Sequence, residues 1–231
     1  MLKLMLVALM LWPALAMADD ARDPWVGFNR PVYRFNDTLD RYILRPVARG
    51  YVRVTPNLAQ QGIHNFFSNL GDVLVVLNDV LQAKPDATGR DFLRLVINST
   101  WGVAGLVDVG TRVGLPKHNQ DLGITLGIWG VPAGPYVVLP FWGPSTLRDA
   151  PASLVSTLLY PINFLKPARD QWGPDALMVV DDRAQLLPLQ ATLDSSGDPY
   201  SLLREVYLQR RDTEIRGPSA QDPFTDDANT P

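Results

Sequence analysis

The chain has 231 residues, a formal net charge of −3 at pH 7 and no cysteine. A mildly acidic chain lacks the basic surface that nucleic-acid binding requires, so we expect no nucleic-acid partner. Without cysteine no disulfide can form, and stability must come from packing or from immersion in a membrane. The length is sufficient for one substantial core, and we expect a single domain.

Residues 1–18 have the pattern of a secretory signal peptide. Lys3 precedes an apolar run from Leu4 to Leu11, and the small residues Ala16-Met17-Ala18 come directly before Asp19. This order indicates export and cleavage between Ala18 and Asp19. The alternative interpretation is a short buried first helix.

Three pairs of a capping residue and a proline predict helix starts, because the side-chain oxygen can cap the first turn and proline suits the first helical position. They are Asp23-Pro24, Thr55-Pro56 and Asp198-Pro199. The first pair opens a predicted amphipathic helix over Trp25–Leu44, which Pro31 could divide into two pieces.

The segment Leu58–Leu81 predicts a long helix that is apolar around most of its circumference. Such a helix is either fully buried or in contact with lipid. Crossing a membrane would place Asp72, Asn78 and Asp79 in hydrocarbon at high cost. Lying along the membrane plane and packing inside a bundle both avoid that cost, and both interpretations stay open.

The next helix is predicted over Pro85–Ser99. It is followed by a glycine-rich stretch, residues 101–114, which predicts tight turns or close approach of the backbone.

The segment Leu122–Leu147 contains no charged residue. It is long enough to cross a bilayer, but its prolines interrupt every helical run of spanning length. Non-helical backbone at membrane depth is tolerated only where it is buried in protein or lines a water-filled cavity. The alternative is a buried system of loops and strands in a soluble domain.

A second nearly uncharged run, Ala150–Leu165, follows it, and regular helices are predicted over Asp175–Leu187 and Tyr200–Arg211. From Thr213 onward the sequence is polar and acidic, which predicts a disordered tail over residues 213–231.

Sequence motifs with a known catalytic mechanism are absent. The two histidines, His64 and His118, are far apart in the sequence, and there is no cysteine to complete a zinc site, so no metal or other cofactor is expected. Asp181-Asp182 could bind a cation, but we interpret the pair as part of a solvated helix face. No nucleophile elbow, P-loop or dinucleotide fingerprint occurs. We therefore predict that the protein is not an enzyme.

Collinear sequence blocks resemble the MlaA (VacJ) family of outer-membrane phospholipid-transport lipoproteins. The main blocks are Asp23-Pro24-Trp25-Val26-Gly27-Phe28-Asn29-Arg30, Arg45-Pro46-Val47-Ala48, Gly105-Leu106-Val107-Asp108-Val109, Thr125-Leu126-Gly127, Gly134-Pro135-Tyr136-Val137, Leu139-Pro140-Phe141, Thr146-Leu147-Arg148-Asp149, Arg183-Ala184-Gln185-Leu186-Leu187 and Asp198-Pro199-Tyr200. The resemblance assigns residues 19–212 to one MlaA-like domain.

The resemblance implies an all-α domain whose amphipathic helices form a ring, with the Gly/Pro-broken apolar segments in its wall. Such a protein lies in the periplasmic leaflet of the outer membrane, held there by a trimeric porin. It moves mislocalised phospholipids from the outer leaflet toward a periplasmic lipid-carrier protein, which maintains lipid asymmetry. Family members carry an acylated cysteine, whereas this sequence has none, so we expect an exported protein without an acyl anchor.

Candidate residues for the lipid passage come from the helix beginning at Leu58 and from Leu122–Leu147. They are Asn65, Phe66, Gly127, Trp129, Tyr136, Phe141 and Trp142. Structural packing is the alternative role for each of them. At the level of the whole protein, the alternatives are a structural envelope protein that binds a porin without transport and a phospholipase-like hydrolase.

Overall fold

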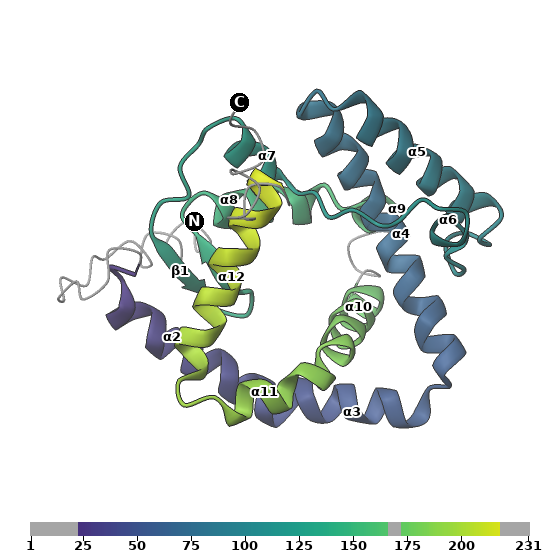
Figure 1. Ribbon diagram of the computed structural model, residues 1–231. Coiled ribbons are helices and arrows are strands. Elements are labelled where there is room, and N and C mark those ends of the chain that lie inside the picture. The colour runs from purple at the N-terminus through teal and green to yellow at the C-terminus, as the bar shows by residue number, and fades with distance from the viewer. Residues whose placement is uncertain (1–22, 166–171, 218–231) are drawn as a thin grey trace, which may run out of the picture.

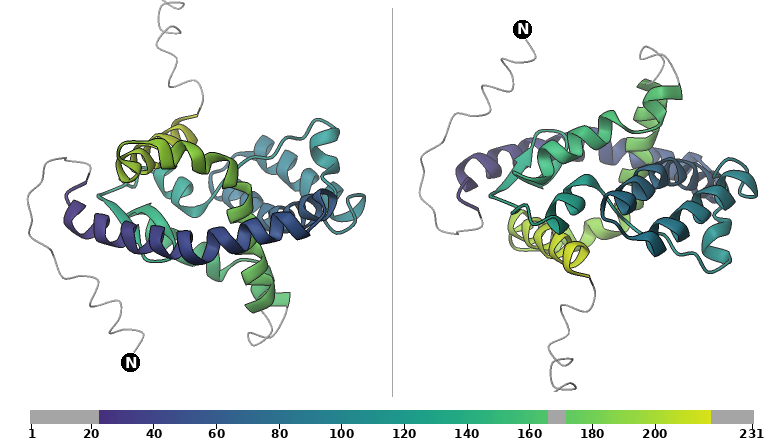
Figure 2. Two further views of the ribbon diagram at one scale, coloured as in Figure 1. Left: turned by 90° about the horizontal axis from the view of Figure 1, so that it is seen from below. Right: turned by 90° about the horizontal axis from the view of Figure 1, so that it is seen from above.

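The computed structural model describes residues 23–165 and 172–217. Helices in these ranges are arranged as a ring around a central opening, which Figure 1 shows face-on and Figure 2 shows from two edges. The predicted signal peptide and most of the predicted tail lie outside the described residues. These helices confirm the predicted all-α ring, to which the structure adds one short β-hairpin.

A long helical rod forms the first side of the ring. It consists of α2 (Val26–Leu39), a π-helical turn η1 (Asp40–Leu44) and α3 (Arg45–Val54). Pro31 lies inside α2 and does not divide it. The rod is thus continuous where the sequence allowed for a break.

Two helices, α4 (Asn57–Leu81) and α5 (Pro85–Thr100), pack against each other on the next side. The short helix α6 (Val109–Arg112) follows a turn in which the backbone folds tightly on itself. A Cβ atom added at Gly102 would lie 2.2 Å from the carbonyl oxygen of Val107. The predicted close approach of the backbone in this stretch is confirmed.

The uncharged segment folds into α7 (Leu122–Ile128), a loop and an antiparallel hairpin of β1 (Tyr136–Leu139) and β2 (Gly143–Thr146). Tyr136 pairs with Thr146 and Leu139 with Gly143. This two-stranded sheet is the addition to the predicted all-α fold.

The remaining elements close the ring. They are α8 (Asp149–Leu158), α9 (Ile162–Leu165), α10 (Trp172–Gln185), a 3₁₀ turn η3 (Leu187–Leu189), α11 (Gln190–Ser195) and α12 (Pro199–Arg216). Helix α12 packs on α7 and on the hairpin. It extends to Arg216, beyond the boundary at Asp212 that the sequence suggested.

A small hydrophobic core lies where α2, the hairpin and α12 meet. Its fully buried members are Tyr136, Val138 and Tyr200. Asp23 lies beside this core and does not cap α2, contrary to the prediction: its carboxylate accepts hydrogen bonds from Asn29, Tyr200 and Arg204. Asp198, by contrast, caps α12 as predicted, since it accepts from the backbone N–H of Ser201 at 3.4 Å.

No helix within residues 23–165 and 172–217 combines the length and the apolar character needed to cross a membrane.

Asp108 joins α5 to α6 through its carboxylate. Oδ1 accepts a hydrogen bond from the backbone N–H of Thr111 at 3.0 Å, and Oδ2 accepts from Nη2 of Arg94 at 3.0 Å. Burial opposes ionisation, but the bonds from Thr111 and Arg94 outweigh it and lower the pKa of Asp108 to about 2. The ionised carboxylate therefore stabilises this corner of the ring.

We predict that Asp108→Asn lowers the free energy of unfolding by about 1–2 kcal/mol at pH 7. The folded-state pKa lies below the unfolded value of about 3.9, so this stabilisation is present above about pH 4 and is lost as the pH falls toward 2. Denaturant unfolding of both proteins in detergent micelles at pH 7, 4 and 3 measures it. A difference that stays constant over this range would contradict the prediction.

Candidate functional site

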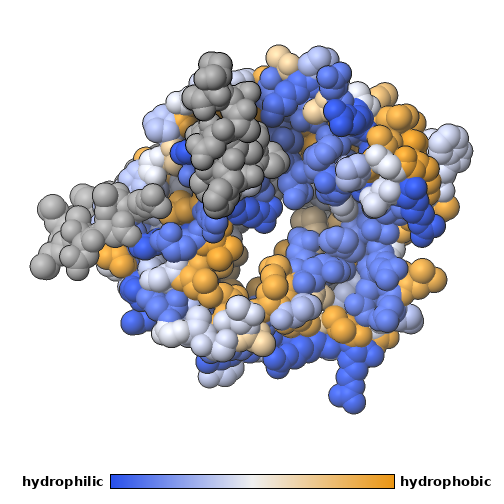
Figure 3. All heavy atoms as spheres, in the orientation of Figure 1, coloured by the Kyte–Doolittle hydropathy of each residue, from blue (hydrophilic) through white to orange (hydrophobic). Residues whose placement is uncertain are grey.

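The central opening persists when all atoms are drawn. Figure 3 shows a hole through the molecule, bordered by both hydrophobic and hydrophilic residues. A boundary of mixed polarity is compatible with a ligand that has a polar and an apolar part.

Most of the residues that α4 buries are polar, although Phe67 and Val75 are buried as well. Its buried residues include Asn69, Asp72 and Asn78, whereas Leu77 and Val80 are exposed. Large apolar side chains are normally buried and unpaired polar ones exposed. The helix therefore turns its polar face toward the protein and its apolar face outward.

The same inversion occurs on α5, which buries Asp91, Arg94 and Asn98. Exposed apolar side chains extend around the ring on other elements as well. Those with more than half of their surface exposed are Tyr42, Ile43, Val54, Leu58, Val80, Phe92, Trp101, Val103, Val113, Trp129, Phe141, Trp142, Leu147, Leu154, Leu158, Phe164, Trp172, Leu186, Leu189 and Val206. An exposed apolar surface of this extent marks contact with a membrane or with a protein partner.

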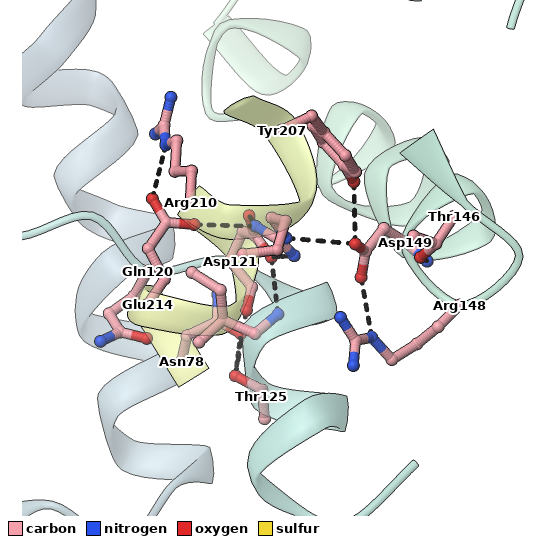
Figure 4. Close-up of polar contacts among 12 residues, drawn as sticks. Asn78, Gln120, Asp121, Thr125, Thr146, Arg148, Asp149, Tyr207, Arg210 and Glu214 are labelled. Atoms are coloured by element: carbon pink, nitrogen blue, oxygen red, sulfur yellow. Dashed lines mark hydrogen bonds and ion pairs between the residues drawn. The ribbon is translucent and has the colours of Figure 1, made fainter. Parts of the chain in front are cut away.

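Asp149, at the start of α8, holds the end of the uncharged segment (Figure 4). Its carboxylate accepts hydrogen bonds from Nε of Arg148 at 2.8 Å, the hydroxyl of Tyr207 at 2.8 Å and Nε of Arg211 at 3.1 Å. Burial alone would raise the pKa of Asp149, but the bonds from Arg148 and Arg211 hold it below its usual value. Asp149 is therefore a buried anion with several donors.

Arg211 of α12 connects this anion to the beginning of the same segment. Its Nη1 lies 2.6 Å from Oδ2 of Asp121, the residue that caps α7 by accepting from the N–H of Ile124 at 2.8 Å. Burial opposes its charge, but Asp121 and Asp149 outweigh this and raise the pKa of Arg211 above its ordinary value. One guanidinium thus holds both ends of the uncharged segment.

A chain of neutral polar side chains attaches α7 to α4. The hydroxyl of Thr125 donates to Oδ1 of Asn78 at 2.7 Å and accepts from Nε2 of Gln82 at 2.9 Å. Gln82 also donates to Oε1 of Gln120 at 2.8 Å. These buried bonds fix the position of α7 without any charged group inside the segment.

A cavity of about 520 Å³ lies between the uncharged segment and α12. Its lining combines charged with apolar side chains, among them Arg148, Arg211, Leu208 and Ile215. Its volume is within the range of small-molecule sites.

The predicted site residues fall into two groups. Asn65, Gly127 and Trp129 lie at contacts between elements: Asn65 donates to the carbonyl of Leu106, Trp129 donates to the carbonyl of Leu81, and a Cβ at Gly127 would lie 2.6 Å from Ile215. The others are aromatic. Phe66 stacks edge-on against Phe67, Phe141 stacks edge-on against Phe35, Trp142 is exposed and Tyr136 is buried in the core.

The structure does not bring these seven residues together in one site. Tyr136 is 1 % exposed and lies among Tyr200 and Tyr207, whereas Phe141 and Trp142 lie exposed at the hairpin turn. Phe141 has a φ of 68°, a left-handed conformation that favours glycine, and its N–H donates to Asn36.

The sequence analysis did not identify the residues that hold the uncharged segment in place. Asp121 and Arg148 are the charged residues directly before and after this segment, and their positions could have identified them. Arg211 gave no such signal, because its bonds to Asp121 and Asp149 connect residues that are far apart in the chain.

Within residues 23–165 and 172–217, one group of three side chains is close enough together to hold a metal ion. Ligand atoms of His64, Asp181 and Asp182 lie within 4.8 Å of one another. Asp181 already binds the hydroxyl of Tyr51 and Nδ1 of His64, each at 3.0 Å, so its carboxylate is satisfied without an ion.

The family model and named relatives of this chain point to the same family. The family model for the MlaA lipoprotein matches residues 21–214. An intermembrane phospholipid transport system lipoprotein MlaA from Shigella flexneri is 39% identical over 200 residues, covering 84% of this chain and 79% of the relative. The protein of the same name from Escherichia coli strain K12 is 38% identical with the same coverage. An uncharacterised protein from Rickettsia felis is 36% identical over 198 residues, covering 85% of this chain and 79% of the relative.

A solved structure has a similar fold. It comes from work on the structural basis for maintenance of bacterial outer membrane lipid asymmetry, and it superposes with a TM-score of 0.73 at 38% sequence identity. The match covers 84% of this chain and 98% of the solved one. The sequence blocks, the helical ring and these relatives agree, and the chain belongs to the MlaA lipoprotein family.

Proposed function

We propose that this protein passes phospholipids out of the outer leaflet of a bacterial outer membrane and thereby maintains lipid asymmetry. The observation that carries the proposal is the inverted burial of α4 and α5 around a central opening. Relatives named as components of an intermembrane phospholipid transport system support it.

The exposed apolar side chains support a position within one leaflet. With no membrane-crossing helix in the described residues, helices that lie along the membrane plane bury their apolar faces among acyl chains and avoid the cost of a charged crossing. Because the sequence contains no cysteine, we propose that these side chains and a porin partner provide the attachment, in place of an acyl chain. The protein would be exported and lie on the periplasmic face.

A phospholipid needs a wet path for its headgroup while its tails stay in hydrocarbon. The mixed border of the opening and the polar and apolar lining of the neighbouring cavity are suited to such a molecule. We propose that Asn65, Phe66, Gly127, Trp129, Phe141 and Trp142 shape the path. Tyr136 would act indirectly by packing the hairpin against α12. A periplasmic lipid carrier would receive the lipid.

We also propose that this function involves no catalysis. His64 contacts Asp181 and His118 contacts Asp91, and in the described part of the chain neither imidazole has a hydrogen bond to a serine. Incubation of purified protein with phospholipid vesicles should release no fatty acid, whereas a hydrolase would release it.

Val80 of α4 is 57 % exposed and should lie among acyl chains. We predict that Val80→Glu weakens binding of the purified protein to phospholipid vesicles by about tenfold or more, because it removes roughly 1.5 kcal/mol of apolar burial and adds a charge. Flotation with vesicles measures it. Gln61→Glu places the same charge at an exposed polar position of α4 and should bind like the parent. Equal binding of the two variants would contradict the proposed membrane position.

Gly127 packs so closely that an added Cβ would lie 2.6 Å from Ile215 and 2.8 Å from Nη1 of Arg148. We predict that Gly127→Leu forces α7 away from α12 and raises the phospholipid content of the cell surface in a strain that has only this variant. Accessibility of surface phospholipid to an impermeant reagent measures it.

The matched control is Gly89→Leu on α5, because no atom lies within 4 Å of a Cβ at Gly89. This control should behave like the parent. Normal surface phospholipid in Gly127→Leu cells with normal protein levels would argue for a structural envelope protein that moves no lipid.

A further inference from the structure

The guanidinium of Arg148 is buried, and one of its nitrogens has no partner in the described part of the chain. The side chain is 4 % exposed. Its Nε donates to Asp149 at 2.8 Å (Figure 4), and its Nη1 donates to the carbonyl of Val131 at 3.3 Å. Nη2 makes no hydrogen bond to a described residue, yet it is not sealed off inside the protein. A buried charged donor without an acceptor is costly, so this nitrogen points to a ligand.

Arg148 lines the cavity of about 520 Å³ between the uncharged segment and α12, and two acids of α12, Glu205 and Asp212, line the same cavity. Gly127 shows which acid is nearer to Arg148. A Cβ at Gly127 would lie 2.8 Å from Nη1 of Arg148 and 2.6 Å from Ile215. Arg148 therefore lies beside Ile215. Asp212 is about one helical turn from Ile215 and Glu205 is about three turns from it, so Asp212 is the nearer acid.

The carboxylate of Asp212 is available to a cation that enters this cavity. In the described ranges it accepts no hydrogen bond, and its one ion pair is with Arg216 at 3.6 Å. The two side chains are 62 % and 64 % exposed, and such a pair contributes little, so a ligand can replace it at little cost. Glu205 differs, because Nε and Nη2 of Arg204 both donate to its Oε1.

The buried charges beside the cavity already balance one another. Arg148 and Arg211 share Asp149, and Arg211 also binds Asp121. A ligand with a net negative charge would bind Arg148 but leave one negative charge in excess. A zwitterion brings its own positive charge, which Asp212 can receive.

We propose that this cavity binds the zwitterionic headgroup of a phospholipid, in which a phosphate ester carries an ammonium group, as in phosphoethanolamine. Nη2 of Arg148 donates to the phosphate, and the carboxylate of Asp212 pairs with the ammonium group. Leu208 and Ile215, which also line the cavity, contact the apolar part that follows the phosphate. This inference rests on the proposed passage of phospholipids and adds the class of headgroup that the passage selects.

The test is native mass spectrometry of the full chain in non-ionic detergent with equimolar phosphatidylethanolamine and phosphatidylglycerol that have identical acyl chains. The parent should retain phosphatidylethanolamine about tenfold more than phosphatidylglycerol, because only the former offers Asp212 a charged partner. Equal retention of the two lipids would overturn this inference and leave the proposed transport intact. Retention of neither lipid would count against both.

A second sample contains glycerophosphoethanolamine, which has the same headgroup without acyl chains. It should bind much more weakly than the lipid, because the apolar wall of the cavity then has no partner. Binding as tight as that of the lipid would assign the cavity to a soluble phosphate ester and overturn the assignment to a lipid.

Two substitutions assign the selectivity to this cavity. Asp212→Asn, at an exposed position, should lower the retention of phosphatidylethanolamine about tenfold without lowering that of phosphatidylglycerol, so that the preference is lost. Arg148→Lys keeps a positive charge beside Asp149 but removes Nη2, and it should weaken the retention of both lipids equally.

Glu205→Gln is the matched control. It neutralises another exposed acid of α12 that lines the cavity but is already held by Arg204, and it should keep the full preference. Loss of the preference in Glu205→Gln, or its survival in Asp212→Asn, would overturn the assignment to Asp212. The parent protein and the Asp212 variant decide the question even if Arg148→Lys fails to fold.

Discussion

The ion pairs of Arg211 with Asp121 and Asp149 are the contacts on which the geometry of the opening depends. The uncharged segment has no charge of its own, so ion pairs hold it only at its two ends, while neutral bonds such as those of Thr125 hold it in between. Arg211 reaches both ends from α12. Removal of one partner of the buried pair Arg211–Asp149 costs about 3–5 kcal/mol, because the other charge stays buried, whereas Asp121 is half-exposed. A shift of the uncharged segment relative to α12 would therefore break these ion pairs.

Inverted burial changes what stabilises this fold. The hydrophobic core around Tyr136 and Tyr200 is small, while carboxylates, amides and guanidinium groups occupy the contacts between helices. Hydrogen bonds between such groups are stronger where water is excluded, and unpaired groups there are correspondingly costly. In the proposed membrane position, the apolar faces gain their stabilisation from acyl chains. The polar network then determines which arrangement of helices is adopted.

Regular elements were predictable from the sequence where one local signal sufficed. The periodicity of α4 and the cap at Asp198 are such cases, and both are confirmed. Periodicity alone cannot tell a lipid-facing stripe from a core-facing one, so the inversion needed the structure. Asp23 looked like a cap but binds Tyr200 of a distant helix. The contacts of Arg211 could not be predicted either, because they depend on how α12 packs against the start of the uncharged segment.

The π-helical turn Asp40–Leu44 sets the register between α2 and α3. An α-helix advances about 100° per residue, and a π-helical turn takes up one extra residue by turning less at each step. The turn thereby keeps Arg45 at its buried position, where it binds Asp40 and Asp194. An inserted or deleted residue that this turn did not absorb would rotate α3 by about 100° and carry Arg45 away from both carboxylates.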